Sequence, residues 1–114
     1  TVIHKLSDHT DGAIVLTGVQ TAKDTLGTAV FSQNKFSLIE RPKYDVIYSG
    51  TGDVFASAFG AAVMNGTDML ASATLASDFV VDCIEATIDA SGDRNYGVNF
   101  ELCITKLLKR LHLA

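Results

Sequence analysis

The sequence predicts an α/β fold in which strands come first and helices follow. Residues 13–48 contain short runs of apolar and β-branched residues, which are typical of strands. Residues 54–111 repeat apolar residues at helical spacing, and a turn of small residues joins the two halves. Because no repeat, low-complexity tract or linker interrupts the chain, we expect residues 1–114 to belong to one domain.

The amino-terminal segment predicts a helix end followed by a buried strand. Residues 1–8 are typical of a last helical turn, which the turn at residues 8–12 closes. Residues 13–17 form a continuous apolar run, as expected of a parallel strand that is buried on both faces. This strand should lie inside the sheet.

A hairpin and a further strand should come next. Residues 28–31 and 36–40 flank the sequence Ser32-Gln33-Asn34-Lys35, which predicts a hairpin turn. Residues 44–48 should form the short strand that enters the small-residue turn. This order predicts an edge hairpin that leads into a central strand beside the candidate site.

The second half should contain three helices. Residues 54–65 predict the first helix, which Asn65-Gly66 ends, and Asp68 can cap the second. The second helix should run to residue 88, and residues 100–111 form the clearest amphipathic pattern in the chain. The expected apolar face of the second helix consists of Met69, Ala73, Ala76, Val80, Cys83 and Thr87.

Two further sets of residues in the helices are candidates for cysteine chemistry or metal binding. Cys83 and Cys103 lie on apolar faces of separate helices without CxxC spacing, so we expect reduced core residues in a cytoplasmic protein. Four acidic residues spaced three to four apart could hold a metal ion, but such a row favours a solvent-exposed helix face. These residues are Asp78, Asp82, Glu85 and Asp89.

The most informative motif is Tyr48-Ser49-Gly50-Thr51-Gly52-Asp53, where the last strand meets the first helix. Its two glycines permit unusual backbone angles and close approach, so the amides of Gly50, Thr51 and Gly52 can converge on an anion near the positive helix start. A carboxylate beside an anion site is suited to accept a proton from an attacking hydroxyl, which is the role we predict for Asp53. The alternative is a tight turn in which Asp53 caps the helix.

This motif and its surroundings resemble the ribokinase superfamily and, within it, the pyridoxal (vitamin B6) kinases. The Gly-Thr-Gly-Asp turn of that family is matched by residues 50–53, and its continuation by residues 54–58. The resemblance covers about residues 12–108 and only the carboxyl-terminal part of the family's sequence. Three further segments are similar to the family's strand at the nucleotide phosphates, its next strand and the segment over the nucleotide, namely residues 13–19, 27–31 and 39–44.

The resemblance implies a ribokinase-like three-layer α/β/α (Rossmann-like) fold, of which residues 1–114 form the carboxyl-terminal, nucleotide-binding portion. It implies phosphoryl transfer from ATP to the hydroxymethyl group of pyridoxal, pyridoxine or pyridoxamine. In that reaction Asp53 would be the catalytic base, and Gly50, Thr51 and Gly52 would form the anion hole. Mg²⁺ is implied as well, with a monovalent cation as a further candidate, but no residue is assigned as a metal ligand.

The resemblance also implies that Thr17 and Gly18 lie near the nucleotide phosphates, and Lys43 and Tyr44 near the base and ribose. Thr17 could instead be a strand-end hydroxyl that satisfies backbone groups, and Lys43 a solvated loop charge. The alternative function is a hydroxymethylpyrimidine (phosphomethylpyrimidine) kinase of thiamine synthesis, although many of those enzymes have Cys where this chain has Asp53. A non-catalytic nucleotide-binding remnant is the other alternative.

The composition indicates an apolar surface that needs a partner. Hydrophobic residues make up 47% of the 114 residues, although much of a small domain's surface must stay in contact with water. The resemblance implies that the partner is the amino-terminal half of the same kinase, without which this portion should be inactive, and that the kinase is a homodimer. A net charge of -4 argues against nucleic-acid or anionic-membrane binding, and no apolar run approaches the roughly 20 residues of a membrane span.

Overall fold

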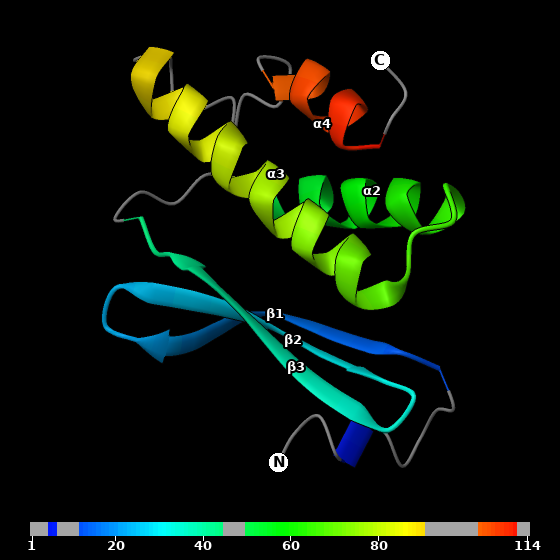
Figure 1. The fold of residues 1–114 in the computed structure, drawn as a ribbon. Coiled ribbons are helices and arrows are strands. Elements are labelled where there is room, and N and C mark those ends of the chain that lie inside the picture. The colour runs from blue at the N-terminus through cyan, green and yellow to red at the C-terminus, as the bar shows by residue number, and fades with distance from the viewer. Residues whose placement is uncertain (1–4, 7–11, 45–49, 91–102, 112–114) are drawn as a thin grey trace.

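The computed structural model describes residues 5–6, 12–44, 50–90 and 103–111. A three-stranded antiparallel sheet, in the order β1-β2-β3, packs one face against a layer of helices (Figure 1). Among the described residues, this arrangement confirms the predicted α/β fold with three helices in the second half. The elements are β1 (Ile14–Ala22), β2 (Thr25–Ser32), β3 (Lys35–Pro42), α2 (Thr51–Met64), α3 (Met69–Ala90) and α4 (Ile104–Arg110).

The predicted hairpin is confirmed as β2 and β3. Gln33 and Asn34 connect the strands with φ angles of 53° and 61°, the left-handed pair that a tight two-residue hairpin turn requires. Pairing continues without a break from Ser32 opposite Lys35 to Thr25 opposite Pro42. Both strands therefore extend beyond the ranges that the sequence predicted. The strand expected at residues 44–48 lies almost entirely outside the described residues.

The prediction of a buried parallel strand at residues 13–17 was wrong. β1 runs antiparallel to β2, because a two-residue turn at residues 23–24 returns the chain directly, whereas a parallel partner would need a long crossover. The apolar run is continuous because β1 carries apolar residues on both of its faces. Val15 packs against the buried Val30, while Ile14 and Leu16 pair with the other face of β2 through Phe31 and Ala29.

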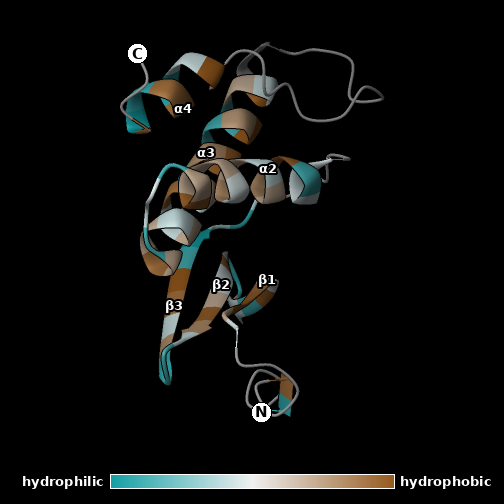
Figure 2. Cartoon of the chain, turned by 90° about the vertical axis from the view of Figure 1, so that its right-hand side faces the viewer, coloured by the Kyte–Doolittle hydropathy of each residue, from teal (hydrophilic) through white to brown (hydrophobic). Residues whose placement is uncertain are grey.

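The face of the sheet that lies away from the helices is strongly apolar. Cross-strand pairing places Phe31 opposite Phe36 and Ala29 opposite Leu38, so these side chains share a face that alternates with the core-facing Val30. Phe36 is 49% exposed and Leu38 43% exposed. Hydrophobic residues occur along the strands (Figure 2). This outer face fits the expectation that some apolar surface needs a partner.

α2 begins earlier than predicted and ends where predicted. Gly50 is its amino-terminal cap, and the Val54 amide donates to the Gly50 carbonyl at 2.9 Å, so the first turn includes the residues expected in a preceding loop. At the other end Gly66 has φ +88°, and the amides of Gly66 and Thr67 donate to the carbonyls of Val63 and Ala62. This pattern is the Schellman ending that Asn65-Gly66 predicted.

The predicted cap of the following helix is also present. The Ala71 amide donates to Asp68 Oδ1 at 2.8 Å, which satisfies one of the free amides at the start of α3. Among the described residues, no helix is long and apolar enough to cross a membrane. α4 begins at Ile104, later than the predicted residue 100, and residues 100–102 lie outside the described part.

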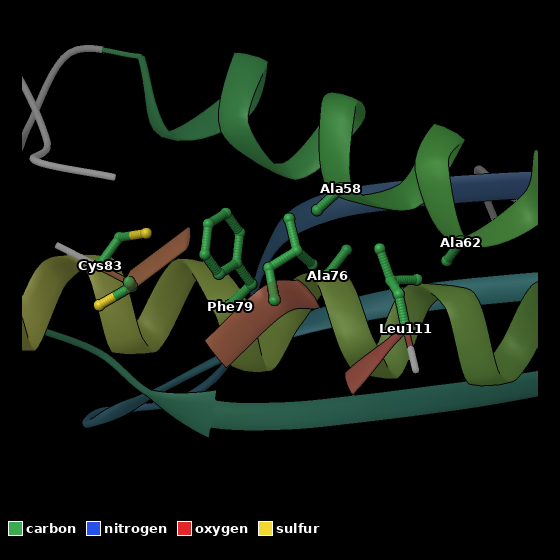
Figure 3. Close-up of a cluster of buried hydrophobic side chains, with 8 residues drawn as sticks. Ala58, Ala62, Ala76, Phe79, Cys83 and Leu111 are labelled. Atoms are coloured by element: carbon green, nitrogen blue, oxygen red, sulfur yellow. The ribbon is translucent and has the colours of Figure 1, made fainter. Parts of the chain in front are cut away.

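The helices pack around one core. Ala58 and Ala62 of α2 and Ala76 of α3 are buried, and their small side chains allow the two helices to approach closely (Figure 3). Phe79 of α3 belongs to the same buried cluster as Leu107 and Leu111, which connect α4 to this core. Of the apolar face predicted for α3, four residues are buried and Met69 and Val80 are half-buried; the buried ones are Ala73, Ala76, Cys83 and Thr87.

Cys83 and Cys103 are free, fully buried thiols in this core, as predicted. The Cys103 thiol donates to the Asp82 carbonyl at 3.3 Å. Burial, with the neighbouring Cys103 and the charge of Asp82, raises the pKa of the Cys83 thiol from 9.0 to about 12. Such a thiol stays protonated at neutral pH and is a poor nucleophile.

This pKa predicts a loss of stability in alkali. Between pH 9 and pH 12 the unfolded thiol ionises while the native thiol stays protonated, so the free energy of unfolding should fall as pH rises. One such group contributes up to about 1.4 kcal/mol per pH unit. Urea unfolding at pH 8 to 11 should show a shallower decline for Cys83→Ala than for the wild type. Equal slopes would contradict the assignment.

Candidate functional site

The glycine turn forms the start of α2. Gly50 adopts φ +86° and ψ 1°, a left-handed conformation that a side chain disfavours, and this bend directs the chain into the helix. The amides of the first turn have no intrahelical acceptors, so those of Thr51 and Gly52 are available to an anion. A Cβ atom added at Gly52 would meet no atom within 4 Å. The space over this turn is therefore open.

Asp53 lies in the first turn of α2 and is exposed. Its carboxylate makes no hydrogen bond with any described residue, and the cap position of the helix belongs to Gly50, which has no side chain. No contact of the described residues therefore supports Asp53 as a helix cap. A carboxylate in this place faces solvent beside the amides of the helix start, where a second reactant could reach it.

Thr17 and Gly18 form a bulge in β1. Pairing jumps from Leu16 opposite Ala29 to Val19 opposite Gly27, so these two residues share the place opposite a single residue of β2. Gly18 has φ +71°, the left-handed conformation that such bulges favour. Bulges re-aim the backbone of a strand and occur often beside active sites. Thr17 is thus part of an irregular, exposed stretch of β1 and not of a regular strand end.

A cavity of about 240 Å³ between the sheet and the helices joins these two features. It is lined by Thr17 and Gly18 from the bulge and by Thr51 and Gly52 from the helix start. Its remaining lining is largely apolar and includes Leu26, Ile39, Phe55, Val80 and Ile84. The structure thus brings together residues that lie more than thirty positions apart in the sequence. Gly50 and Asp53 are not among the lining residues.

Lys43 and Tyr44 lie beyond the end of β3 and do not line the cavity. The Lys43 amide donates to the Asp24 carbonyl at 2.8 Å, while its side chain is exposed. Burial, a hydrogen bond with Glu85 and the charges of Glu85 and Asp82 raise the pKa of the Tyr44 hydroxyl. Tyr44 therefore lies near Glu85 of α3.

Arg41 reaches the cavity and was not predicted as a site residue. Its Nε donates to Asp78 Oδ1 at 2.6 Å, and its Nη1 donates to the Glu40 carbonyl at 2.7 Å. Asp78 also lies 3.6 Å from Arg110 Nη1, and Arg110 Nη2 lies 2.9 Å from Asp82 Oδ2. Sequence spacing gave no signal for these contacts, because Arg41 and Asp78 are 37 positions apart.

These ion pairs correct part of the prediction of an acidic solvent face on α3. Asp78 and Asp82 are 30% and 19% exposed and connect α3 to β3 and α4, whereas Glu85 is exposed as expected. Within the described ranges, no group of three or more His, Cys, Asp or Glu side chains could hold a metal ion.

The chain matches the sequence profile of one protein family, described as phosphomethylpyrimidine kinase, over residues 1–99. No curated protein matches it. Among solved structures it is similar to a putative phosphomethylpyrimidine kinase from Bacteroides thetaiotaomicron, with 24% identity and a TM-score of 0.80 over 96% of this chain and 36% of that one.

Two solved pyridoxal kinases are similar as well. The one from Lactobacillus plantarum is 21% identical, with a TM-score of 0.77 over 85% of this chain and 35% of that one. The one from Entamoeba histolytica is 17% identical, with a TM-score of 0.79 over 94% of this chain and 38% of that one. The fold is therefore that of the ribokinase-like kinases, and the chain spans little more than a third of the length of these structures.

Proposed function

The chain belongs to the phosphomethylpyrimidine kinase family, and from this premise we propose that it is the nucleotide-binding portion of a kinase that phosphorylates the hydroxymethyl group of a B6 vitamer with ATP. The observation that supports this proposal is the cavity that joins the bulge of β1 to the start of α2. Exposed amides at a helix start are suited to hold phosphate oxygens. The exposed Asp53 in the same helical turn supplies a carboxylate for proton transfer.

In this proposal each residue has a separate role. The amides of Gly50, Thr51 and Gly52 stabilise the negative charge that develops around the transferred γ-phosphoryl group. Asp53 accepts the proton of the vitamer hydroxyl as its oxygen bonds to phosphorus and the bond to the ADP oxygen breaks. Thr17 and Gly18, which are exposed, contact the phosphates at the mouth of the cavity and leave its buried interior free.

Lys43 and Tyr44 are proposed to lie near the base and ribose, because the two residues before them, Arg41 and Pro42, line the cavity. Mg²⁺ would accompany ATP and neutralise phosphate charge. No carboxylate cluster among the described residues fits a resident metal ion. Mg²⁺ is commonly held by substrate phosphates and water with few protein ligands. None of the steps above requires a protein ligand to Mg²⁺.

The apolar outer face of the sheet supports a further part of the proposal. Phe36 and Leu38 are large apolar side chains that are about half exposed, which is unfavourable on a surface in contact with water. The chain also covers little more than a third of the similar structures. We therefore propose that the amino-terminal half of the same kinase packs on this face and completes the vitamer pocket. We also propose that the complete kinase is a homodimer.

The pyrimidine substrate is the second candidate. The description of the matching family favours it, whereas Asp53 favours the B6 vitamers because many pyrimidine kinases have Cys at that position. Both reactions use the same nucleotide site.

Substrate assays on the full-length protein distinguish the candidates. With ATP and Mg²⁺, we expect phosphorylated pyridoxal, pyridoxine or pyridoxamine by mass spectrometry, with kcat/KM at least about tenfold above that for hydroxymethylpyrimidine. Turnover of the pyrimidine with inert vitamers would establish the second candidate instead. Nucleotide binding without transfer to any of these acceptors would indicate a non-catalytic remnant.

A further inference from the structure

Thr28 carries a buried hydroxyl that has no partner among the described residues. It lies on β2 opposite the bulge of β1, pairs with Ile39 of β3, and is 8% exposed. Directly paired residues point to the same face of a sheet, and Ile39 belongs to the core cluster on the helix-facing side. The Thr28 side chain therefore points toward the helices, into the wall of the cavity that it lines.

The other buried hydroxyls of the described residues are all satisfied. Ser72 donates to the Thr67 carbonyl at 3.2 Å, Ser77 to the Ala73 carbonyl at 2.8 Å and Thr87 to the Cys83 carbonyl at 2.6 Å. Buried polar groups without a partner are rare in proteins, since each loses its hydrogen bonds to water and gains none. Thr28 is thus the exception, and its hydroxyl faces the cavity that we assign to the ligand.

The shape and lining of the cavity indicate what could pair with this hydroxyl. Its volume of about 240 Å³ falls below the roughly 300–1,000 Å³ typical of pockets that hold a whole drug-sized ligand, so it suits one ring and not an entire nucleotide. Leu26 and Ile39 of the sheet and Val80 and Ile84 of α3 give it apolar walls. Ser77 and Arg41 also line the cavity but are bonded to the Ala73 carbonyl and to Asp78, and Thr17 and Thr51 belong to the proposed phosphate site. Apolar walls with one further hydroxyl, that of Thr28, suit a flat heteroaromatic ring with a polar atom at its edge.

We propose that Thr28 is a specificity-determining residue whose hydroxyl forms a hydrogen bond with a heteroaromatic ring in this cavity. The inference rests on the proposed function for the choice of ring. In that reaction such a ring comes from the base of the nucleotide or from the B6 vitamer. A hydroxyl both donates and accepts, so it can pair with a ring nitrogen or with an exocyclic amino or hydroxyl group.

Thr28→Val in the full-length protein tests the proposal, because it replaces the hydroxyl by a methyl group of similar size. We expect the Kd of the ring-bearing ligand to rise about 3- to 10-fold, the cost of one neutral hydrogen bond. The Tm should stay the same or rise, since no protein partner is lost and Val is favourable in a strand. Thr28→Ser should keep the wild-type Kd because it keeps the hydroxyl.

Thr87→Val is the matched control. Its hydroxyl is buried and bonded to the Cys83 carbonyl, and Thr87 does not line the cavity. This variant should lower the Tm and leave every Kd unchanged. Kd values are measured by calorimetry without turnover, for ATP, ADP and adenosine in one series and for pyridoxal and pyridoxine in another.

The two series distinguish the sources of the ring. A weaker Kd for ATP, ADP and adenosine alike identifies the nucleotide base, and a weaker Kd for the vitamers alone identifies the substrate ring. Unchanged Kd values in both series, a fall in Tm like that of Thr87→Val, or a wild-type protein that binds neither ligand would overturn the inference. Ligand binding that depends on Thr28 in a protein that transfers no phosphoryl group would refute the proposed function and leave this inference standing.

Discussion

Replacing Asp53 by Asn in the full-length protein should lower kcat by roughly 100- to 10,000-fold, the usual contribution of a general base. The amide side chain cannot accept the proton of the attacking hydroxyl. The KM for ATP should change little, because the proposed phosphate contacts come from Gly50, Thr51 and Gly52. The fold should survive, since Asp53 is exposed and forms no hydrogen bond with the described residues. Steady-state kinetics and thermal melting on the same preparation measure both effects.

Asp68→Asn supplies the control for this change. It makes the same substitution at the start of another helix, where Asn can still accept the hydrogen bond from the Ala71 amide. We expect its kcat to equal that of the wild type. If Asp53→Asn behaved in the same way with an intact fold, Asp53 would have no catalytic role.

Gly52→Val should weaken nucleotide or transition-state binding by about 100-fold or more, since a small displacement in such a site is enough for a loss of that size. A Cβ atom at this position meets no atom within 4 Å, and Gly52 lines the cavity, so the valine side chain would enter the space that the phosphates are proposed to occupy. Because Gly52 is helical and its φ is not positive, Val can be accommodated without backbone strain. ATP saturation curves and isothermal binding of ADP would reveal the loss.

Gly60→Val is the corresponding control in the same helix. A Cβ at Gly60 also meets nothing within 4 Å, and Gly60 lies two turns further along α2 from the glycine turn. It should leave nucleotide binding unchanged. Equal ATP affinity in Gly52→Val and the wild type would mean that the phosphates bind elsewhere.

The sequence by itself determined the features that depend on a few neighbouring residues. The turn at Gln33 and Asn34, the helix ending at Asn65-Gly66 and the Asp68 cap all follow from backbone preferences and side chains within one turn of the chain. The same holds for the glycine turn, where Gly50 alone permits the observed φ. The conformation of the glycine turn could therefore be predicted locally, whereas its role as an anion hole stays a prediction.

Only the tertiary structure decided what depends on distant segments. The direction of β1 follows from its pairing with β2, and its apolar run cannot distinguish a parallel buried strand from an antiparallel one that is apolar on both faces. The contact of Arg41 with Asp78 joins elements 37 positions apart, and no local pattern encodes it.

The cavity belongs to the same class of features. The bulge at Thr17 and Gly18 reaches the start of α2 only because the sheet and the helices bury their apolar faces together. That packing also left the Thr28 hydroxyl inside without a partner among the described residues, a property of its surroundings that a threonine in a sequence does not reveal.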